Sequence, residues 1–266
     1  QPNAMGGREV GGLANQLAAH MGFTEDAIDR VKRFWQSPNL SQKPGLKAVD
    51  MFDAVASGKI KAIWIMATNP VVSMPEADKV KQALEQCELV VVSECMANSD
   101  TARVANVLLP ATTWGEKHGT VTNAERRISL QKSLLKKPGL ARHDWAIMCD
   151  FARRMGFAEA FSFQHPVEIF REHAALSGFE NKGERAFDIS ALKHITLSEY
   201  EQFQPIQWPI NKDKSGTPRL FSDGSFFTDN RKAQFIAVTS QRPKATPSNH
   251  EWVLNTGRIR DQWHTI

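Results

Sequence analysis

The chain has 266 residues and a mass of 29.8 kDa, which fits one large domain or two of ordinary size. Apolar residues make up 41% and charged residues 23%, so disorder, collagen and coiled coil are excluded as descriptions of the whole chain. The net charge of +4 forms no basic stripe, so it indicates no nucleic-acid partner. No apolar run approaches the roughly 18–20 residues that span a membrane. The three scattered cysteines form no C-x-x-C pair; they suggest no metal site and fit a reducing compartment.

The first elements predicted along the chain are helices. Apolar residues recur with helical spacing from Val10 to Met21, which predicts an amphipathic helix there. A second helix is expected to begin after Thr24, a good N-cap residue, and to run to Trp35. Residues 37–45 contain two prolines and a glycine and indicate a linker. A short helix over residues 48–56 follows.

Strands and helices then alternate, a pattern that predicts a parallel sheet with right-handed crossovers. Strands are expected over residues 60–66, 89–92 and 107–109. The middle strand is expected to be buried on both faces. Of the two intervening helices, one begins after Ser73, whose spacing to Glu76 fits a capping box, and the other covers residues 99–104. The predicted class is therefore α/β, with a Rossmann-like half domain that lacks the G-x-G-x-x-G fingerprint.

The second half of the chain is less regular. Residues 110–142 show neither helical nor strand periodicity, and loops of that length are uncommon unless they are functional or disordered. Helices are expected over residues 143–155, 166–176 and 196–203, the last after a Thr-x-x-Glu cap. Short strands are expected within residues 219–238. Val253 and Leu254 are expected to begin a strand of another domain.

Polar side chains follow the first two predicted strands. In an open parallel sheet, ligands bind outside the carboxyl ends of the strands, and the residues there are Asn69, Ser93 and Glu94. Asn69 offers a donor and an acceptor, and the Glu94 carboxylate suits the two N–H groups of a guanine edge. Asn-Pro and Ser-Glu are also ordinary connectors between strands and helices, so both interpretations stay open.

Four other positions could bind a ligand. Lys117 lies in a loop with Glu116, His118 and Gly119, which offers the groups that a phosphate or a pterin needs, although solvated surface has the same composition. Asp144 could equally be an acid favoured by the first turn of a helix. Arg8, beside two glycines, could hold a small anion or form a salt bridge. Residues 255–265 combine hydroxyls, a glycine, a guanidinium and an imidazole.

Taken together, these segments resemble one family, the molybdenum enzymes with a bis(molybdopterin guanine dinucleotide) cofactor. The matching segments cover residues 1–12, 67–70, 108–120, 123–127 and 255–265, and they look most like the catalytic subunit of assimilatory nitrate reductases. The resemblance implies that residues 1–150 belong to an α/β molybdopterin oxidoreductase domain. It also implies a helical and irregular connecting region over residues 151–247 and the start of a β-rich dinucleotide-binding domain over residues 248–266.

The resemblance assigns roles to individual residues. One guanine dinucleotide would be held by Asn69, Ser93, Glu94, Lys117 and Asp144. The pterin ends would be held by Thr256, Gly257, Arg258, Trp263, His264 and Thr265. The catalytic residues near the metal would be Gln1, Met5 and Arg8. Arg8 would supply positive charge for nitrate and Met5 would line the approach.

The implied reaction is the two-electron reduction of nitrate to nitrite by oxygen-atom transfer, with electrons arriving through a [4Fe-4S] cluster. The cysteines that would hold that cluster and the metal are absent from this chain. We therefore expect an internal fragment of a cytoplasmic subunit, inactive by itself, whose electron donor is a reductase subunit, ferredoxin or flavodoxin that the sequence does not identify. The alternatives are a formate dehydrogenase or periplasmic nitrate reductase of the same family, or a non-catalytic nucleotide-binding scaffold.

Overall fold

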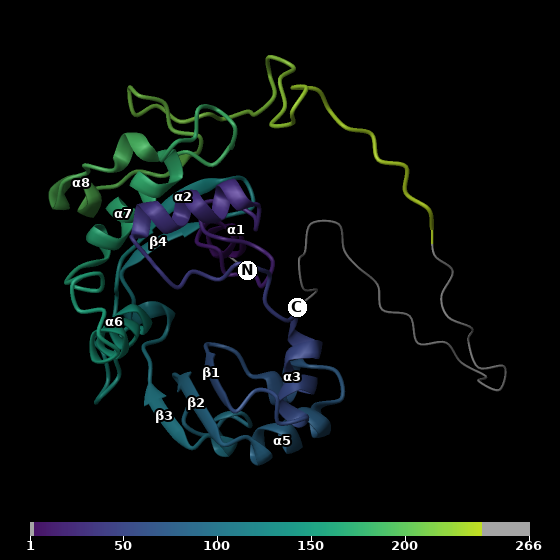
Figure 1. Ribbon diagram of the computed structural model, residues 1–266. Helices are drawn as coiled ribbons and strands as arrows, with labels where there is room; N and C mark the ends of the chain where they lie inside the picture. Colours follow the sequence, from purple (N-terminus) through teal and green to yellow (C-terminus); the bar gives the residue numbers. More distant parts are fainter. Residues whose placement is uncertain (1–2, 241–266) are drawn as a thin grey trace, which may run out of the picture.

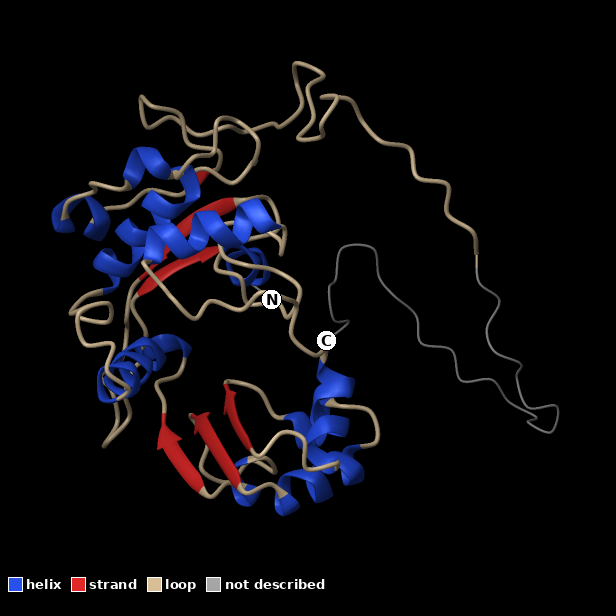
Figure 2. Cartoon of the chain, in the orientation of Figure 1, coloured by secondary structure: helices blue, strands red, loops and turns tan. Residues whose placement is uncertain are grey.

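The computed structural model describes residues 3–240 of the chain (Figures 1 and 2). These residues form a mixed α/β structure with two three-stranded sheets, one parallel and one antiparallel. No helix among them has the length and apolar character needed to cross a membrane. The strand expected at Val253 and Leu254 lies outside the described residues.

The predicted parallel sheet is confirmed. It contains β1 (Ala62–Met66), β2 (Leu89–Glu94) and β3 (Val107–Pro110) in the order β1-β2-β3. Met66 pairs with Ser93, and Glu94 pairs with Pro110, so the carboxyl ends of the three strands align at one edge. The connecting segments are α4 (Pro70–Ser73), α5 (Ala77–Gln86) and the short 3-10 helix η1 (Ala102–Val104).

One face of this sheet is covered by α5 and by α3 (Ala48–Ala56) (Figure 1). Val90 and Val92 lie fully buried in the core that these helices form with the sheet. On the other face Leu89 is 41% exposed, and an apolar hollow of about 450 Å³ separates the strands from α6 (Asp144–Arg154). The expectation that residues 89–92 are buried on both faces is therefore wrong.

The capping box predicted at Ser73 is also wrong. Pro70 starts α4 one turn earlier, because its fixed φ and missing N–H suit the first position of a helix, and Ser73 ends that helix. The next helix, α5, begins at Ala77. Its N-cap residue Glu76 has a left-handed backbone and makes no side-chain cap.

The helix predicted from Val10 to Met21 does not form. The chain instead has a short helix, α1 (Ala4–Glu9), followed by turns. Gly11 has a φ of +79°, and a Cβ there would lie 2.7 Å from the Ala18 nitrogen, so the chain folds back on itself. Ala19 and His20 also have positive φ. Of the apolar residues that suggested the helix, Leu17, Ala18 and Met21 are buried, whereas Val10 and Leu13 are exposed.

The next two segments agree with their predictions. Helix α2 (Glu25–Trp35) begins where expected, with the Thr24 hydroxyl accepting a hydrogen bond from the Ala27 N–H. Its acidic first turn and basic last turn complement the helix dipole. Residues 37–45 form an irregular linker to α3.

Residues 110–142 contain regular structure that their sequence did not indicate. After the 3-10 helix η2 (Trp114–Glu116), β4 (Gly119–Thr122) and β5 (Arg127–Gln131) form an antiparallel pair, which β6 (Ile206–Gln207) extends. The Asn123 side chain accepts hydrogen bonds from the backbone N–H groups of residues 125 and 127 and thereby closes the turn between β4 and β5.

Three predicted helices of the second half are confirmed as α6, α7 (Pro166–Gly178) and α8 (Leu197–Glu201), with a 3-10 helix η3 (Ser190–Leu192) before the last. The Thr196 cap of α8 forms a complete capping box with Glu199. The strands expected within residues 219–238 are absent from the structure, which has turns and irregular backbone there. Asp223 and Gly224 form a turn without flanking strands.

A second hydrophobic core joins α2 and α7 to the antiparallel sheet. Its buried members include Val31, Ile128, Ala174, Phe187 and Tyr200. These residues come from both sides of residue 150, so a single core draws on the first and second halves of the chain. The division into segments at residues 150 and 247 stays a prediction.

The last residue of α1 holds this helix against the antiparallel sheet. Glu9 is buried, and its two carboxylate oxygens accept hydrogen bonds from the Thr122 hydroxyl at 2.8 Å and from the Trp208 Nε1–H at 2.6 Å. Burial raises the pKa of Glu9 to about 7, although the two hydrogen bonds partly oppose this shift. Glu9 thus connects α1 with the end of β4 and the segment after β6.

The raised pKa predicts how stability depends on pH. The folded chain binds the Glu9 proton more tightly than the unfolded chain, so this residue stabilises the fold below its ordinary pKa, and that contribution is lost as the pH rises through about 7. Replacing Glu9 with Gln should therefore flatten the fall in unfolding free energy between about pH 5 and about pH 8, measured by urea denaturation. The exposed control Glu25→Gln should keep the slope of the unchanged chain. Identical slopes for both variants would contradict this role of Glu9.

Candidate functional site

The carboxyl ends of β1, β2 and β3 point toward the part of the molecule that carries α1 (Figure 2). Asn69 lies here, in the turn between β1 and α4. Its side-chain oxygen accepts hydrogen bonds from the Thr101 hydroxyl at 2.6 Å and from the Thr101 N–H at 3.2 Å. Asn69 therefore ties the loop after β1 to the loop after β2.

Ser93 and Glu94 end β2 and differ in their surroundings. The Ser93 side chain is buried, and its hydroxyl oxygen accepts a hydrogen bond from Trp64 Nε1 at 2.9 Å. Glu94 is half-buried, and one of its oxygens accepts hydrogen bonds from the N–H and the thiol of Cys95. The hydrogen bond to Glu94 is the main cause of a raised Cys95 pKa, which the charge of Lys117 partly opposes. Lys117 therefore lies within electrostatic reach of the end of β2.

Lys117 and Asp144 form a close ion pair beside the end of β3. The Lys117 ammonium donates to one oxygen of Asp144 at 2.6 Å, and the two side chains are 33% and 26% exposed. The loop before Lys117 is fixed by a capping box between Thr113 and Glu116, and Asp144 is the first residue of α6.

The other oxygen of Asp144 lacks a hydrogen-bond donor in the described residues. This atom, Oδ1, is buried. Because a buried acceptor without a donor costs free energy, the position favours a ligand that supplies an N–H or O–H group. Lys117 beside it offers a positive charge. The structure thus brings Glu94, Lys117 and Asp144 to one edge, and Asn69 and Ser93 use their side-chain oxygens to hold the surrounding loops.

The residues predicted to lie near a metal are only partly described. Arg8 lies on α1, is exposed and forms no ion pair within the described part of the chain. Its charge adds to burial in lowering the pKa of His20. Met5 packs against the second core. Gln1 lies outside residues 3–240. So do the residues expected to hold pterin ends, Thr256, Gly257, Arg258, Trp263, His264 and Thr265.

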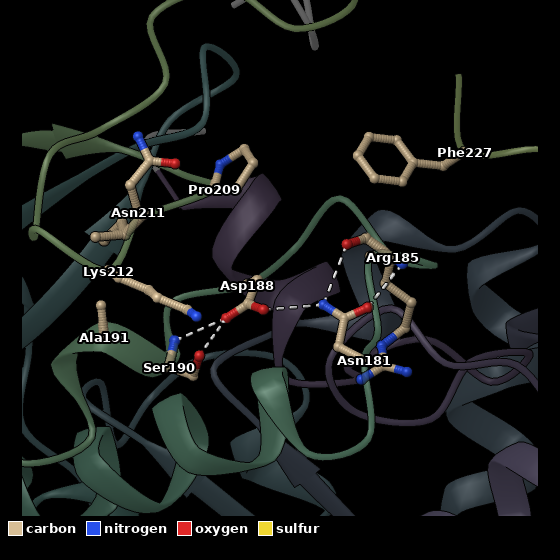
Figure 3. Close-up of a pocket in the computed structure, with 11 residues that line it drawn as sticks. Asn181, Arg185, Asp188, Ser190, Ala191, Pro209, Asn211, Lys212 and Phe227 are labelled. Carbon is tan, nitrogen blue, oxygen red and sulfur yellow. Dashed lines mark hydrogen bonds between the residues drawn. The ribbon is translucent and has the colours of Figure 1, made fainter. Parts of the chain in front are cut away.

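A separate pocket of about 510 Å³ lies between the turns after α7 and the segment after β6 (Figure 3). Its central carboxylate, Asp188, accepts hydrogen bonds from the Asn181 amide at 3.2 Å and from the N–H and hydroxyl of Ser190. The Asn181 side chain also donates a hydrogen bond to the backbone carbonyl of Arg185 and accepts one from the backbone N–H of Arg185. Asp188, Asn181 and Ser190 are thus paired with one another, whereas Nε and Nη1 of Arg185 are buried without a hydrogen-bond partner among the described residues.

Sequence reasoning missed two groupings of polar side chains. The first is Glu9 with Thr122 and Trp208, and the second contains His118, His165 and Glu201, whose ligand atoms lie within 4.8 Å of one another. Their members are far apart in the chain, so no local spacing reveals them. His118 lies in the polar, glycine-bearing loop around Lys117 that the sequence analysis noted as a possible ligand site, but nothing there pointed to His165 or Glu201.

The semi-buried pair at Lys117 should matter more to stability than an exposed pair of similar length. Lys117→Ala leaves the Asp144 carboxylate partly buried without its cation, so we expect the unfolding free energy to fall by about 1–2 kcal/mol. The control is Lys61→Ala, which breaks a 3.1 Å pair with Glu88 whose side chains are 70% and 68% exposed. Such a pair is worth less than about 0.5 kcal/mol. Equal losses for the two variants, measured by urea denaturation, would contradict this ranking.

Comparison with known proteins shows which family contains the residues at this edge of the parallel sheet. A model of the molybdopterin oxidoreductase family matches residues 3–154, which include every element of the parallel sheet and both members of the ion pair. The whole chain is 48% identical to nitrate reductases from Klebsiella oxytoca and Shewanella frigidimarina. It is also 32% identical to the F420-dependent formate dehydrogenase subunit alpha of Methanocaldococcus jannaschii. A solved structure, acetylene hydratase from Pelobacter acetylenicus, aligns over 87% of this chain and 27% of its own, with 15% identity and a TM-score of 0.48.

The chain spans only part of the length of these relatives. It is covered completely in each of the three sequence matches, but it accounts for 30%, 29% and 37% of the relatives' own lengths. The family model nevertheless matches more than half of the 266 residues. The chain belongs to the molybdopterin oxidoreductase family, whose members use a molybdenum–pterin cofactor.

Proposed function

We propose that this chain is part of a molybdenum-dependent nitrate reductase that reduces nitrate to nitrite. The observation that carries the proposal is the 48% identity, over the complete chain, to nitrate reductases from two organisms. The formate dehydrogenase subunit is more distant, at 32% identity. When bound, a bis(molybdopterin guanine dinucleotide) molybdenum centre supplies the two-electron oxygen-atom chemistry, and the chain's own residues bind and orient the reactants.

The edge formed by the ends of β1, β2 and β3 suits a guanine dinucleotide. The buried Asp144 oxygen that lacks a donor would accept a hydrogen bond from the guanine edge, and Glu94, at the end of β2, offers a second carboxylate at the same edge of the sheet. Lys117 would neutralise a phosphate or hold Asp144 in place through the 2.6 Å hydrogen bond. Asn69 and Ser93 would act mainly by fixing the loops around the ligand, because Thr101 and Trp64 engage their side-chain oxygens.

Arg8 is the residue that we assign to nitrate. It carries an exposed guanidinium with no acidic partner in the described residues, and a planar guanidinium donates two parallel hydrogen bonds to a planar oxyanion. The buried Glu9 next to it holds α1 against the antiparallel sheet. Gln1 and Met5 would line the approach to the same centre.

The remaining parts of the proposal rest on the family resemblance. Residues 256–265 would hold the pterin ends of the cofactor. Electrons would arrive through a [4Fe-4S] cluster carried elsewhere in a longer polypeptide, consistent with relatives about three times the length of this chain. We also propose an assimilatory role in the cytoplasm.

A chimera provides the test of this function. We would replace the matching segment of the Klebsiella oxytoca nitrate reductase by this chain, which aligns with it from end to end. The chimera should reduce nitrate with a chemical electron donor. Arg8→Ala in it should raise the nitrate KM by at least about tenfold, because a charged hydrogen bond worth roughly 1.5–3 kcal/mol is removed, while molybdenum content stays unchanged.

The matched control is Arg219→Ala, at an exposed arginine outside the proposed site, which should leave KM unchanged. A chimera that retains molybdenum and oxidises formate without reducing nitrate would contradict the assigned substrate. A chimera that lacks molybdenum although it folds would instead support the non-catalytic scaffold. Equal nitrate KM values for the Arg8→Ala chimera and its parent would remove Arg8 from the site.

A further inference from the structure

Two histidines and a glutamate from three separate elements meet on the side of the molecule that holds β4, α7 and α8 (Figure 1). His118 directly precedes β4, His165 is the N-cap residue of α7, and Glu201 is the last residue of α8. One Glu201 oxygen lies 3.1 Å from His118 Nε2 and 3.7 Å from His165 Nε2. We call these three residues the histidine–glutamate cluster.

We propose that the histidine–glutamate cluster binds a divalent transition-metal ion of the Zn²⁺ type, independently of the nitrate site. Such ions bind well to imidazole nitrogens together with a carboxylate oxygen, whereas Mg²⁺ and Ca²⁺ prefer oxygen ligands alone. Ligand bonds of about 2.1 Å at tetrahedral angles place neighbouring ligand atoms about 3.4 Å apart. The distances of 3.1 and 3.7 Å lie on either side of that value. Three protein ligands leave a fourth position for water.

The state of His118 supports a metal over a simple ion pair. Its Nε2 atom is buried and makes no hydrogen bond within the described part of the chain, although the Glu201 oxygen is 3.1 Å away. The two atoms are close, but they are not oriented as donor and acceptor. An ion bound to both atoms would satisfy them, whereas the protein groups of the described residues leave this buried nitrogen unpaired.

The surroundings hold the cluster in place without competing for its charge. Tyr200 is buried, and its ring lies edge-on to the rings of both histidines, with centroids 5.8 and 6.2 Å away. Glu201 makes no ion pair with a lysine or arginine among residues 3–240. Its negative charge is therefore available to a cation.

His165 must change its tautomer when the ion binds. Its Nδ1 accepts a hydrogen bond from the Val167 N–H at 3.2 Å, which places the ring proton on Nε2 while the metal is absent. Coordination through Nε2 moves that proton to Nδ1 and breaks this cap, with no net proton released by His165. Because this cap of α7 is lost when the ion binds, the affinity for the metal falls by a factor of about five. That loss is small compared with the affinity that three zinc ligands provide.

The test uses the purified 266-residue chain without a histidine tag, stripped of metal by a chelator. It carries Cys95→Ser, because the exposed Cys95 thiol is a competing zinc ligand. Zn²⁺ titrated by calorimetry, and in competition with a chromogenic chelator, should bind saturably with one ion per chain. Co²⁺ should give the visible absorption of a tetrahedral site, and Mg²⁺ should not bind. Failure of Zn²⁺ to bind saturably would overturn the proposal.

Variants locate the ion. His118→Asn and Glu201→Gln should each weaken Zn²⁺ binding by at least about tenfold, whereas His194→Asn, at an exposed histidine outside the cluster, should not. Circular dichroism checks the fold. If His118→Asn misfolds, the Zn²⁺ affinity of Glu201→Gln still tests the site. The Glu201 side chain is 41% exposed and Gln has the same shape as Glu, so this variant should fold. An unchanged Zn²⁺ affinity of Glu201→Gln would overturn the proposed site and would mean that the Zn²⁺ binding is adventitious only. Neither result bears on nitrate reduction, which the chimera tests separately.

Discussion

The parallel pairing of β1, β2 and β3 is the constraint on which the candidate site depends. Because Met66 pairs with Ser93 and Glu94 with Pro110, the segments that leave the three strands all begin at one edge. Val90 and Val92, buried beneath α3 and α5, fix this register, since a slip by one residue would turn them toward the other face of the sheet. The position of the groups that we propose to bind the cofactor is a consequence of that alignment.

A second constraint joins the parallel sheet to the rest of the molecule. Lys117 reaches back to Asp144 at the sheet edge, and His118, the next residue, contributes to the histidine–glutamate cluster beside α7 and α8. Farther along, Thr122 at the end of β4 binds the buried Glu9 and so positions α1. One short stretch of chain therefore lies between the proposed cofactor site, the proposed metal site and the helix that carries Arg8.

Features with local causes could be predicted from the sequence, and those with distant causes could not. The caps at Thr24 and Thr196 depend on neighbouring residues, and the strands of the parallel sheet are short continuous apolar runs, so both were predicted correctly. The helical spacing of residues 10–21 was misleading, because Gly11 reverses the chain and only the second half of the segment is buried. The short strands β4 and β5 could not be predicted, because they are stabilised by pairing with each other rather than by an apolar pattern of their own. Likewise, Glu9 meets Trp208 only in the folded chain, so no sequence pattern reveals that contact.

We propose that the aligned strand ends, with the unpartnered oxygen of Asp144, hold the guanine end of a molybdenum–pterin cofactor. The most direct measurement is the guanine nucleotide released by acid from the purified chimera, with and without Asp144→Ala. The proposed role of Asp144 predicts that the folded variant holds the guanine end at least about tenfold more weakly, because a charged hydrogen bond is lost, so that its content of guanine nucleotide and of molybdenum falls below that of the parent. Full guanine and molybdenum content in a folded Asp144→Ala chimera would contradict it.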